Sequence, residues 1–451
     1  MTDLHSLKEN IEQRLRAYDS KLGLLQNETV PNYHSNLEKG VYHRTSENTD
    51  FAVDIFYAET EEYYSIANSI LRKIASLQQK EGEWRGLWPY FYEEPLEKMH
   101  APDWNYADFN AIPILCALKD HPEKLEEGML EILKEASINA CYAIMKRDLT
   151  VIYTNPCVMD IYVTIICGEL CEREDFIQYG KAKLKKFYHN IMANRSFDEY
   201  NCTGYSLLIA ELFSLMLKHI KDAEALEKIE ELNFIVWETM GKHFHFKTGD
   251  VVGPNFRRYI NFLEKGEKSN IELATGTKLL LNEEVVARGS GYMYSPVCPK
   301  ELLHYFNESH NEDYSRLFTR GSNYPWFNQP NVDTLYMEED YTLSSFSLMD
   351  CWNQRSLLNS YIGNREEKCC IRLRVLHDNY DFSSGAVATV QHKNAAISVV
   401  NFHTNHGDTH VDLDPIVDST ITASDLRVRF QIESNSTGVT EKIEYEKTEN
   451  I

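Results

Sequence analysis

Apolar residues recur with a helical period over the first half of the chain. Ile66, Ile70, Ile74 and Leu77, for example, lie three or four positions apart and share one helix face. Pro, Asn, Asp and Gly residues bound several similar segments downstream. We therefore predict a train of antiparallel helical hairpins, with helices over residues 107–119, 123–147, 156–172, 174–194, 203–220 and 222–242.

After Phe246 the helical period gives way to alternation. Residues 371–375 and 426–430 alternate apolar side chains with arginines, and residues 397–402 form an apolar run. A short helix near 299–317 is the exception. The predicted fold class is α+β and multidomain, with an (α/α) toroid-like domain over 1–245, an antiparallel β-sandwich over 246–445 and a disordered tail over 446–451.

Length and charge narrow the classes of function. The chain has 451 residues, 43% of them hydrophobic, which is enough for more than one core. The formal net charge of -23 argues against a nucleic-acid partner, because phosphate backbones are held by clustered Lys and Arg. The charged segment Met1–Gln26 does not resemble a secretory signal, and no apolar run predicts a membrane span. We therefore expect a cytoplasmic protein.

The sequence also lacks several signatures of cofactor and nucleophile chemistry. The ten cysteines contain no CxxC pair, which favours free thiols in a reducing compartment. No phosphate-binding glycine loop, GxSxG or HExxH motif occurs. We therefore expect no cofactor, and neither a serine hydrolase nor a zinc protease.

An asparagine recurs about every 50 residues, beside an aromatic residue or at a turn. The four positions are Asn105, Asn155, Asn201 and Asn255. This spacing is close to the length of one helical hairpin with its loop, so a repeat of hairpins would bring these loops to one end. Polar loops gathered at the mouth of a helical barrel favour a polar, extended ligand, and sugars are the leading candidate.

The first polar segments are rich in aromatic residues. Trp84, Trp88 and Trp104 offer faces on which pyranose rings stack, and Asn105 and Asp108 can hydrogen-bond sugar hydroxyls. The alternative is that these aromatic residues pack one hairpin against the next, which we prefer for Leu87 and Phe91.

The next two segments precede apolar helices. Asn155 lies before Pro156 and suits a helix N-cap as well as a binding role. Glu199, Tyr200 and Asn201 form the densest polar cluster, in which Glu199 or Tyr200 can act as acid or base. We favour function there, because a cap does not require Glu, Tyr and Asn together.

The fourth segment lies between the two predicted domains. Arg257 and Arg258 are suited to a carboxylate or sulfate, and the neighbouring Tyr259 can serve as acid or base. An interdomain salt bridge is the alternative. Upstream, His243 and His245 alternate in an expected strand, and one of them can shuttle protons.

A histidine-rich stretch near the carboxyl end has the spacing of metal ligands. His403, His406, Asp408 and His410 lie close in sequence, but they also fit a polar β-turn between two strands. We favour the turn, and we expect no metal.

Helical hairpins with polar loops, followed by a sandwich and a Gly253-Pro254-x-x-Arg257-x-Tyr259 segment, resemble toroid-plus-sandwich carbohydrate-active enzymes. The nearest group is that of the heparinase II/III-like and chondroitin or alginate lyases. The resemblance implies β-elimination from a uronate-containing oligo- or polysaccharide. It implies that Asn155 or Asn201 neutralises the uronate carboxylate, that Tyr200 or Tyr259 handles the C5 proton, and that Arg257 or Arg258 clamps the anion. His243 is the nearest substitute for a partner base.

Two other functions remain open from the sequence. A glycoside hydrolase similar to the unsaturated glucuronyl hydrolases would use Asp108, Asp160 or Glu199 as acid and base. A glycan-binding protein without catalysis would need neither.

Overall fold

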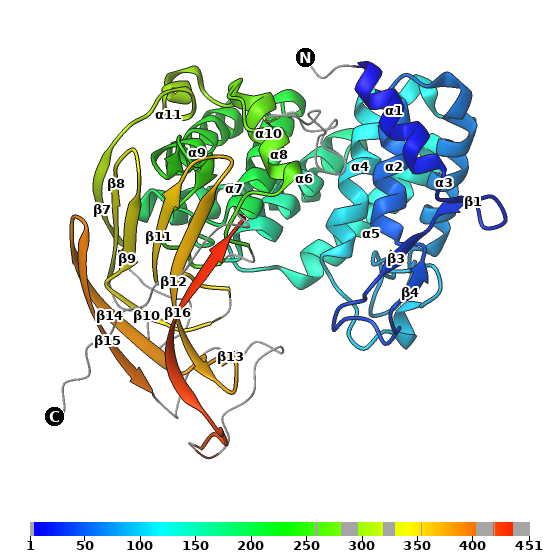
Figure 1. Ribbon diagram of the computed structural model, residues 1–451. Coiled ribbons are helices and arrows are strands. Elements are labelled where there is room, and N and C mark those ends of the chain that lie inside the picture. Colours follow the sequence, from blue (N-terminus) through cyan, green and yellow to red (C-terminus); the bar gives the residue numbers. More distant parts are fainter. Residues whose placement is uncertain are drawn as a thin grey trace, which may run out of the picture. The chain divides into compact units, whose positions relative to one another are not determined.

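The computed structural model describes residues 4–257, 260–280, 296–318, 330–352, 354–402, 418 and 420–435. The chain divides into two compact units. Unit 1 comprises Met1–Met240 and Leu263–Asn307, and unit 2 comprises Gly241–Phe262 and Glu308–Ile451. Within the described ranges, residues 263–280 and 296–307 thus group with the helices, although they lie beyond the expected domain boundary at residue 245. The architecture is α+β: helices fill unit 1, and antiparallel sheets fill unit 2 (Figure 1).

Unit 1 consists of helices joined in hairpins, preceded by short strands. The predicted helices are confirmed to within a few residues, and α5 begins later than expected because a turn over Pro122–Lys124 comes first. The helices are α1 (Leu4–Leu15), α2 (Thr45–Tyr57), α3 (Tyr64–Leu77), α4 (Tyr106–Asp120), α5 (Met129–Arg147), α6 (Thr154–Leu170), α7 (Glu174–Asn194), α8 (Thr203–His219), α9 (Ala223–Lys242), α10 (Lys265–Thr275) and α11 (Leu303–Asn307). Two small hairpins pair β1 (Tyr18–Asp19) with β2 (Leu24–Leu25), and β3 (Asn27–Thr29) with β4 (Gly40–Tyr42).

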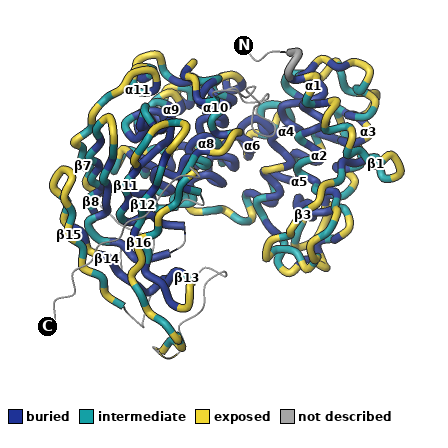
Figure 2. Tube along the Cα trace, viewed as in Figure 1, coloured by how far each residue is buried: buried dark blue, intermediate teal, exposed yellow. Residues whose placement is uncertain are grey.

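Alternate helices of unit 1 pack side by side. Helix α2 contacts α4, α4 contacts α6, α6 contacts α8, and α8 contacts α10. Helix α6 is buried from Thr154 to Gly168, and α4 is almost as fully buried, as the dark tube of Figure 2 shows. Helix α7, in contrast, alternates buried residues with exposed Lys and Glu. The helices that follow the asparagine-bearing loops are therefore the enclosed ones, as their low charge indicates.

The described residues of unit 2 form two larger antiparallel sheets and one small hairpin. One sheet has the order β13-β12-β11-β9-β8-β7 with β16 paired to β12, and the other has the order β10-β14-β15. Strand β14 contacts β9, and β10 contacts β8. The strands are β5 (Phe244–His245), β6 (Asp250–Val251), β7 (Glu312–Phe318), β8 (Asn331–Met337), β9 (Thr342–Phe346), β10 (Leu348–Asp350), β11 (Leu358–Gly363), β12 (Lys368–His377), β13 (Tyr380–Asp381), β14 (Gly385–His392), β15 (Ala395–Phe402) and β16 (Leu426–Ser434).

Two elements correct the predicted pattern. The helix expected near 299–317 ends at Asn307, and Glu312–Phe318 form strand β7 because their side chains alternate and pair with β8. Helix α10 was not predicted, because its apolar stripe is weak; a capping box at Glu264 and Gly276 in the left-handed conformation bound it.

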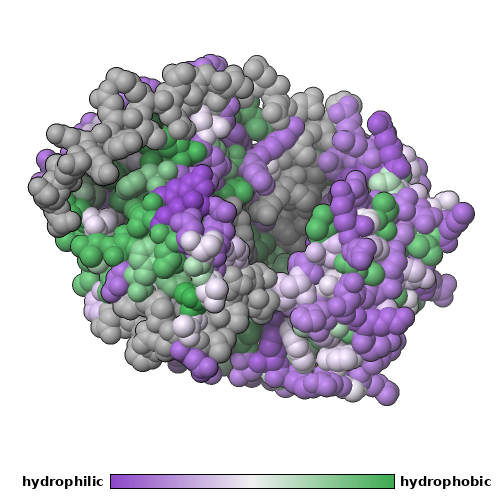
Figure 3. Space-filling view, turned by 60° about the horizontal axis from the view of Figure 1, so that its bottom comes forward, coloured by the Kyte–Doolittle hydropathy of each residue, from purple (hydrophilic) through white to green (hydrophobic). Residues whose placement is uncertain are grey.

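Apolar side chains remain exposed on the strands of unit 2. Val390, Ile397 and Val399 project from β14 and β15, and Phe430 projects from β16. In Figure 3, green, apolar surface is seen over unit 2, on the left of the view.

Candidate functional site

Three of the four asparagine-bearing loops meet at one end of the unit 1 helices. Arg147, the last residue of α5, makes the first of the contacts that link them. Its Nη1 donates a hydrogen bond to Asn105 Oδ1 at 2.8 Å, and its Nη2 donates to Asp160 Oδ1 at 2.7 Å and to Asp108 Oδ2 at 3.0 Å. One guanidinium therefore joins the loop before α4 to helix α6.

A second contact joins the loop before α6 to the loop before α8. The backbone N–H of Asn155 donates to Glu199 at 3.0 Å, and the Asn155 amide donates to both carboxylate oxygens at 2.8 and 3.0 Å. Asn201 follows two residues later with a φ of 51°, in the left-handed region that asparagine tolerates better than most residues. The Asn105, Asn155 and Asn201 loops of unit 1 are therefore linked in succession, the first to α6 through Arg147 and the second to the third through Glu199.

Buried charge is concentrated around Arg147. Asp108 and Asp160 have no exposed surface, and Lys183 Nζ lies 2.7 Å from Asp160 Oδ2. The pKa of Asp108 is raised well above its usual value. Burial is the largest cause and the nearby charge of Asp160 is the second, while Arg147 opposes the shift. Asp108 thus holds its proton more tightly than an exposed carboxyl group does.

A pocket of about 420 Å³ lies on the solvent side of Lys183. Its lining includes Asp148, Thr150, Tyr179, Lys183 and Lys186. Tyr179 donates to Asp148 at 2.8 Å and accepts from Lys183 at 2.9 Å. The buried charge network is therefore separated from this pocket by a single side chain.

The three tryptophans predicted to stack on sugars differ in exposure. Trp88 is completely buried, and its indole N–H donates to the carbonyl oxygen of Ile74 at 2.9 Å. It is a core residue in this structure and offers no face to a ligand. Trp84 and Trp104 are partly exposed, and the Lys146 ammonium lies 5.6 Å from the ring centroid of Trp104. Trp104 adjoins Asn105 and remains beside the Arg147 network.

The predicted acid and base residues before α8 are largely enclosed. Tyr200 is 1% exposed. Glu199 is 8% exposed, and both of its carboxylate oxygens accept hydrogen bonds from Asn155. In this conformation the Glu199 side chain ties the loop to Asn155, and the Tyr200 side chain is enclosed.

The fourth asparagine, Asn255, belongs to unit 2. Its backbone pairs with Ser356 in an isolated bridge, and its side chain has no exposed surface. Within the described ranges, neither atom of its amide group has a hydrogen-bond partner. Arg257 donates from Nε to Gln354 at 3.1 Å. Arg258 and Tyr259 lie outside the described residues.

The two predicted histidines help to hold residues 241–262 against the main sheet. His243 is fully buried, with Nε2 3.5 Å from Asp333 Oδ2. His245 contacts Thr248 Oγ1 at 2.9 Å and the carbonyl oxygens of Glu338 and Glu339, each at 3.0 Å. Burial lowers the pKa of His245, which favours its neutral form.

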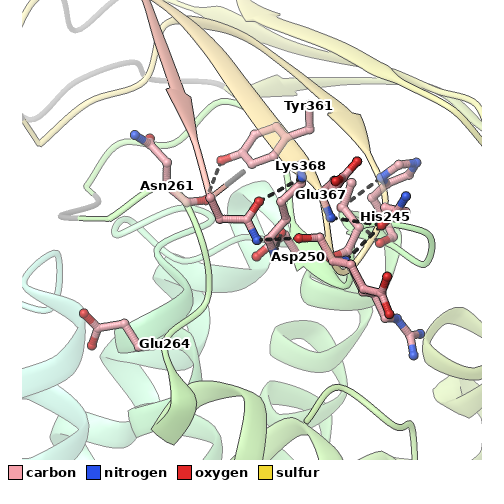
Figure 4. A network of polar contacts seen from close by, with 12 residues as sticks. His245, Asp250, Asn261, Glu264, Tyr361, Glu367 and Lys368 are labelled. Atoms are coloured by element: carbon pink, nitrogen blue, oxygen red, sulfur yellow. Dashed lines mark hydrogen bonds and ion pairs between the residues drawn. The ribbon is translucent and has the colours of Figure 1, made fainter. Parts of the chain in front are cut away.

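Figure 4 shows the remainder of this unit 2 network. Lys368 forms a buried ion pair with Asp250 and donates to the carbonyl oxygen of Thr248 at 3.2 Å. The hydroxyl of Tyr361 donates to the carbonyl oxygen of Asn261 at 2.8 Å. These contacts connect β11 and β12 to the segment that carries Asn255.

Sequence reasoning did not identify Arg147 or Lys183. Both lie on Glu- and Lys-rich helices, whose charged positions we expected to be exposed to solvent. The only local signal for Arg147 was its position in the last turn of α5, where a positive charge stabilises the helix dipole.

Two further expectations concern a metal and a membrane. The His403, His406, Asp408 and His410 motif and the tail over 446–451 lie outside the described residues. No three His, Cys, Asp or Glu side chains in the described ranges are grouped as metal ligands would be. No helix in the described part of the chain has the length and apolarity needed to cross a membrane.

No curated protein matches the chain. Residues 5–266, more than half of the sequence, match a domain of unknown function, DUF8769, and this stretch includes all four asparagine-bearing loops. The chain therefore belongs to the DUF8769 family.

Proposed function

We propose that this protein is a carbohydrate-active enzyme that cleaves a uronate-containing glycan by β-elimination. The observation that carries the proposal is the meeting of the Asn105, Asn155 and Asn201 loops through Arg147 and Glu199. Polar side chains from separate hairpins, gathered at one end of the helices, form the kind of surface that hydrogen-bonds a sugar chain.

The proposed architecture is an (α/α) toroid-like domain with a β-sandwich. Its support is the succession of contacts from α2 through α4, α6 and α8 to α10, and the contacts of β14 with β9 and of β10 with β8. The proposed resemblance to heparinase II/III-like and chondroitin or alginate lyases rests on this arrangement and on the Gly253-Pro254-x-x-Arg257 segment.

Elimination requires a base for the C5 proton and a group that stabilises the charge building on the carboxylate. Donors that are already oriented lower this barrier most effectively. We assign the neutralising amide to Asn201, with Asn155 as the alternative, because Asn201 adjoins the candidate base Tyr200.

Tyrosine is the candidate for the proton transfer. Tyr200 adjoins Asn201, and its burial means that the loop must open for the phenol to reach a substrate. Tyr259 is the alternative, with Arg257 or Arg258 as the anion clamp. The partly exposed Trp84 and Trp104 supply stacking surfaces.

The test is turnover of uronate polymers, followed by the ultraviolet absorbance of the unsaturated product. Asn201→Ala and Tyr200→Phe should lower kcat by about 10²-fold or more, because each removes a transition-state interaction. Tyr188→Phe on α7 is the matched control: the Tyr188 hydroxyl donates to Glu231 on α9, outside the asparagine-bearing loops, and the variant should keep full activity.

One observation favours a hydrolase as the second candidate. Asp108 and Asp160 accept from the same guanidinium nitrogen, and the pKa of Asp108 is raised, so one carboxyl group is biased toward the acid form and its neighbour is close by. Their complete burial weighs against direct contact with substrate. New reducing ends without new ultraviolet absorbance would favour hydrolysis over elimination. Binding of uronate polymers without any turnover would leave a glycan-binding protein.

A further inference from the structure

A second pocket, remote in sequence from the Asn105, Asn155 and Asn201 loops, lies between the first helix and α10. Its volume is about 520 Å³, within the range of small-ligand sites. The lining is Asn10, Gln13, Arg14, Ala17, Asn27, Lys265 and Gly266. All seven residues belong to unit 1.

The chemistry of this lining is unusual for so acidic a chain. It combines two cations with three carboxamides, whereas the protein carries a formal charge of -23. Two carboxylates adjoin the lining: Asp54 pairs with Arg14, and Glu47 accepts a hydrogen bond from the Asn27 amide at 2.9 Å. Carboxamides hydrogen-bond hydroxyl groups, and a guanidinium matches a carboxylate in a bidentate way. A ligand with both hydroxyl groups and a negative charge satisfies this set.

Arg14 is held in place before any ligand arrives. Its Nη1 donates to Asp54 Oδ2 at 2.6 Å, and its guanidinium carbon lies 4.7 Å from the ring centroid of Phe51. Asp54 is fully buried, whereas 24% of the Arg14 side chain is exposed. A guanidinium has five N–H donors, so Asp54 fixes its orientation while other donors can face the pocket.

At the amino end of α10, the group that faces the pocket is a side chain and not the helix backbone. Its backbone is already capped, since the N–H of Glu264 donates to the Glu267 side chain at 3.0 Å. The exposed Lys265 therefore supplies the positive charge on this side of the pocket.

We propose that the pocket between α1 and α10 binds an acidic saccharide, with Arg14 and Lys265 on its carboxylate and with Asn10, Gln13 and Asn27 on its hydroxyl groups. The choice of a uronate rests on the proposed function. Because the pocket is separate from the loops assigned to cleavage, it is a binding subsite for the glycan and carries no step of the reaction.

Calorimetric titration of the full chain with a galacturonate trimer tests this site, with a neutral galactose trimer as the comparison ligand. Lys265→Glu should weaken trimer binding tenfold or more. Lys268→Glu makes the same charge change three positions along α10, outside the lining, and should leave the affinity unchanged. Asn10→Ala should weaken binding of the trimer without affecting the fold, because its side chain is partly exposed.

The outcomes separate the two proposals. Equal trimer affinity in wild type, Lys265→Glu and Asn10→Ala, or no binding of the trimer to wild type, overturns the pocket. Absence of turnover on every uronate polymer, with trimer binding that still depends on Lys265, overturns the proposed reaction and supports the pocket.

Discussion

Asp54 allows a quantitative test of how burial and pairing balance in unit 1. Its carboxyl group has no exposed surface and is paired with Arg14. Burial raises the pKa of Asp54 from 3.8 to about 6, although Arg14 opposes the shift. At 1.36 kcal/mol per pKa unit, ionised Asp54 costs the folded state about 3 kcal/mol near pH 7.

The pH dependence follows from the sign of this difference. The folded state binds the Asp54 proton more tightly than the unfolded chain does, so the stabilisation from protonation is complete below pH 3.8 and is lost as the pH rises through about 6. Asp54→Asn is neutral at every pH. Between pH 5 and pH 7.5, wild type should therefore lose about 1.4 kcal/mol of unfolding free energy relative to this variant.

Urea unfolding at several pH values, followed by tryptophan fluorescence, measures this change. Trp88 and Trp237 are buried in unit 1 and report on its unfolding. Glu62→Gln is the control, because it removes a carboxylate that is exposed on the surface of the same unit. Parallel stability curves for wild type and Asp54→Asn across this range would refute the reasoning, since they would mean that Asp54 titrates alike in the folded and unfolded states.

Two further predictions concern a close backbone contact at Gly86 and the buried ion pair between Lys368 and Asp250. Gly86→Ala should destabilise unit 1 by about 3 kcal/mol or more, because φ is 92° and the added Cβ would clash with the carbonyl oxygen of Asn139. Gly82→Ala, with a φ of 79° but open space around it, should cost only about 1 kcal/mol; equal losses in thermal unfolding would contradict the clash. Lys368→Met should destabilise unit 2 by about 3 to 5 kcal/mol, and adding Asp250→Leu should recover most of that loss in urea unfolding. A double variant as unstable as Lys368→Met would show that the ion pair is not the reason.

The positions of most elements can be predicted from the sequence. Helix α6 was expected over 156–172 and spans Thr154–Leu170, and the alternation at 371–375 lies within β12. Both follow from the backbone, whose period of 3.6 or 2 residues is written into the order of apolar side chains. Where that period is weak or short, as in α10 and β7, the prediction failed.

The recurring asparagines were also visible in the sequence, because a hairpin repeat returns the chain to the same end at regular intervals. Three of the four loops meet in unit 1, through Arg147 and Glu199. Arg147 itself was not predicted, since its partner Asp108 is 39 residues away and no local pattern links them.

The sequence by itself determined the α+β class, the hairpin train and the loops on which polar chemistry would lie, because these depend on neighbours within a few residues. Only the tertiary structure decided that Trp88 and Tyr200 are buried, that Asp108 and Asp160 share one guanidinium, and that Arg14 faces a pocket beside α10. Burial and charge pairing depend on which distant segments pack together, and local hydrophobic periodicity does not encode that choice.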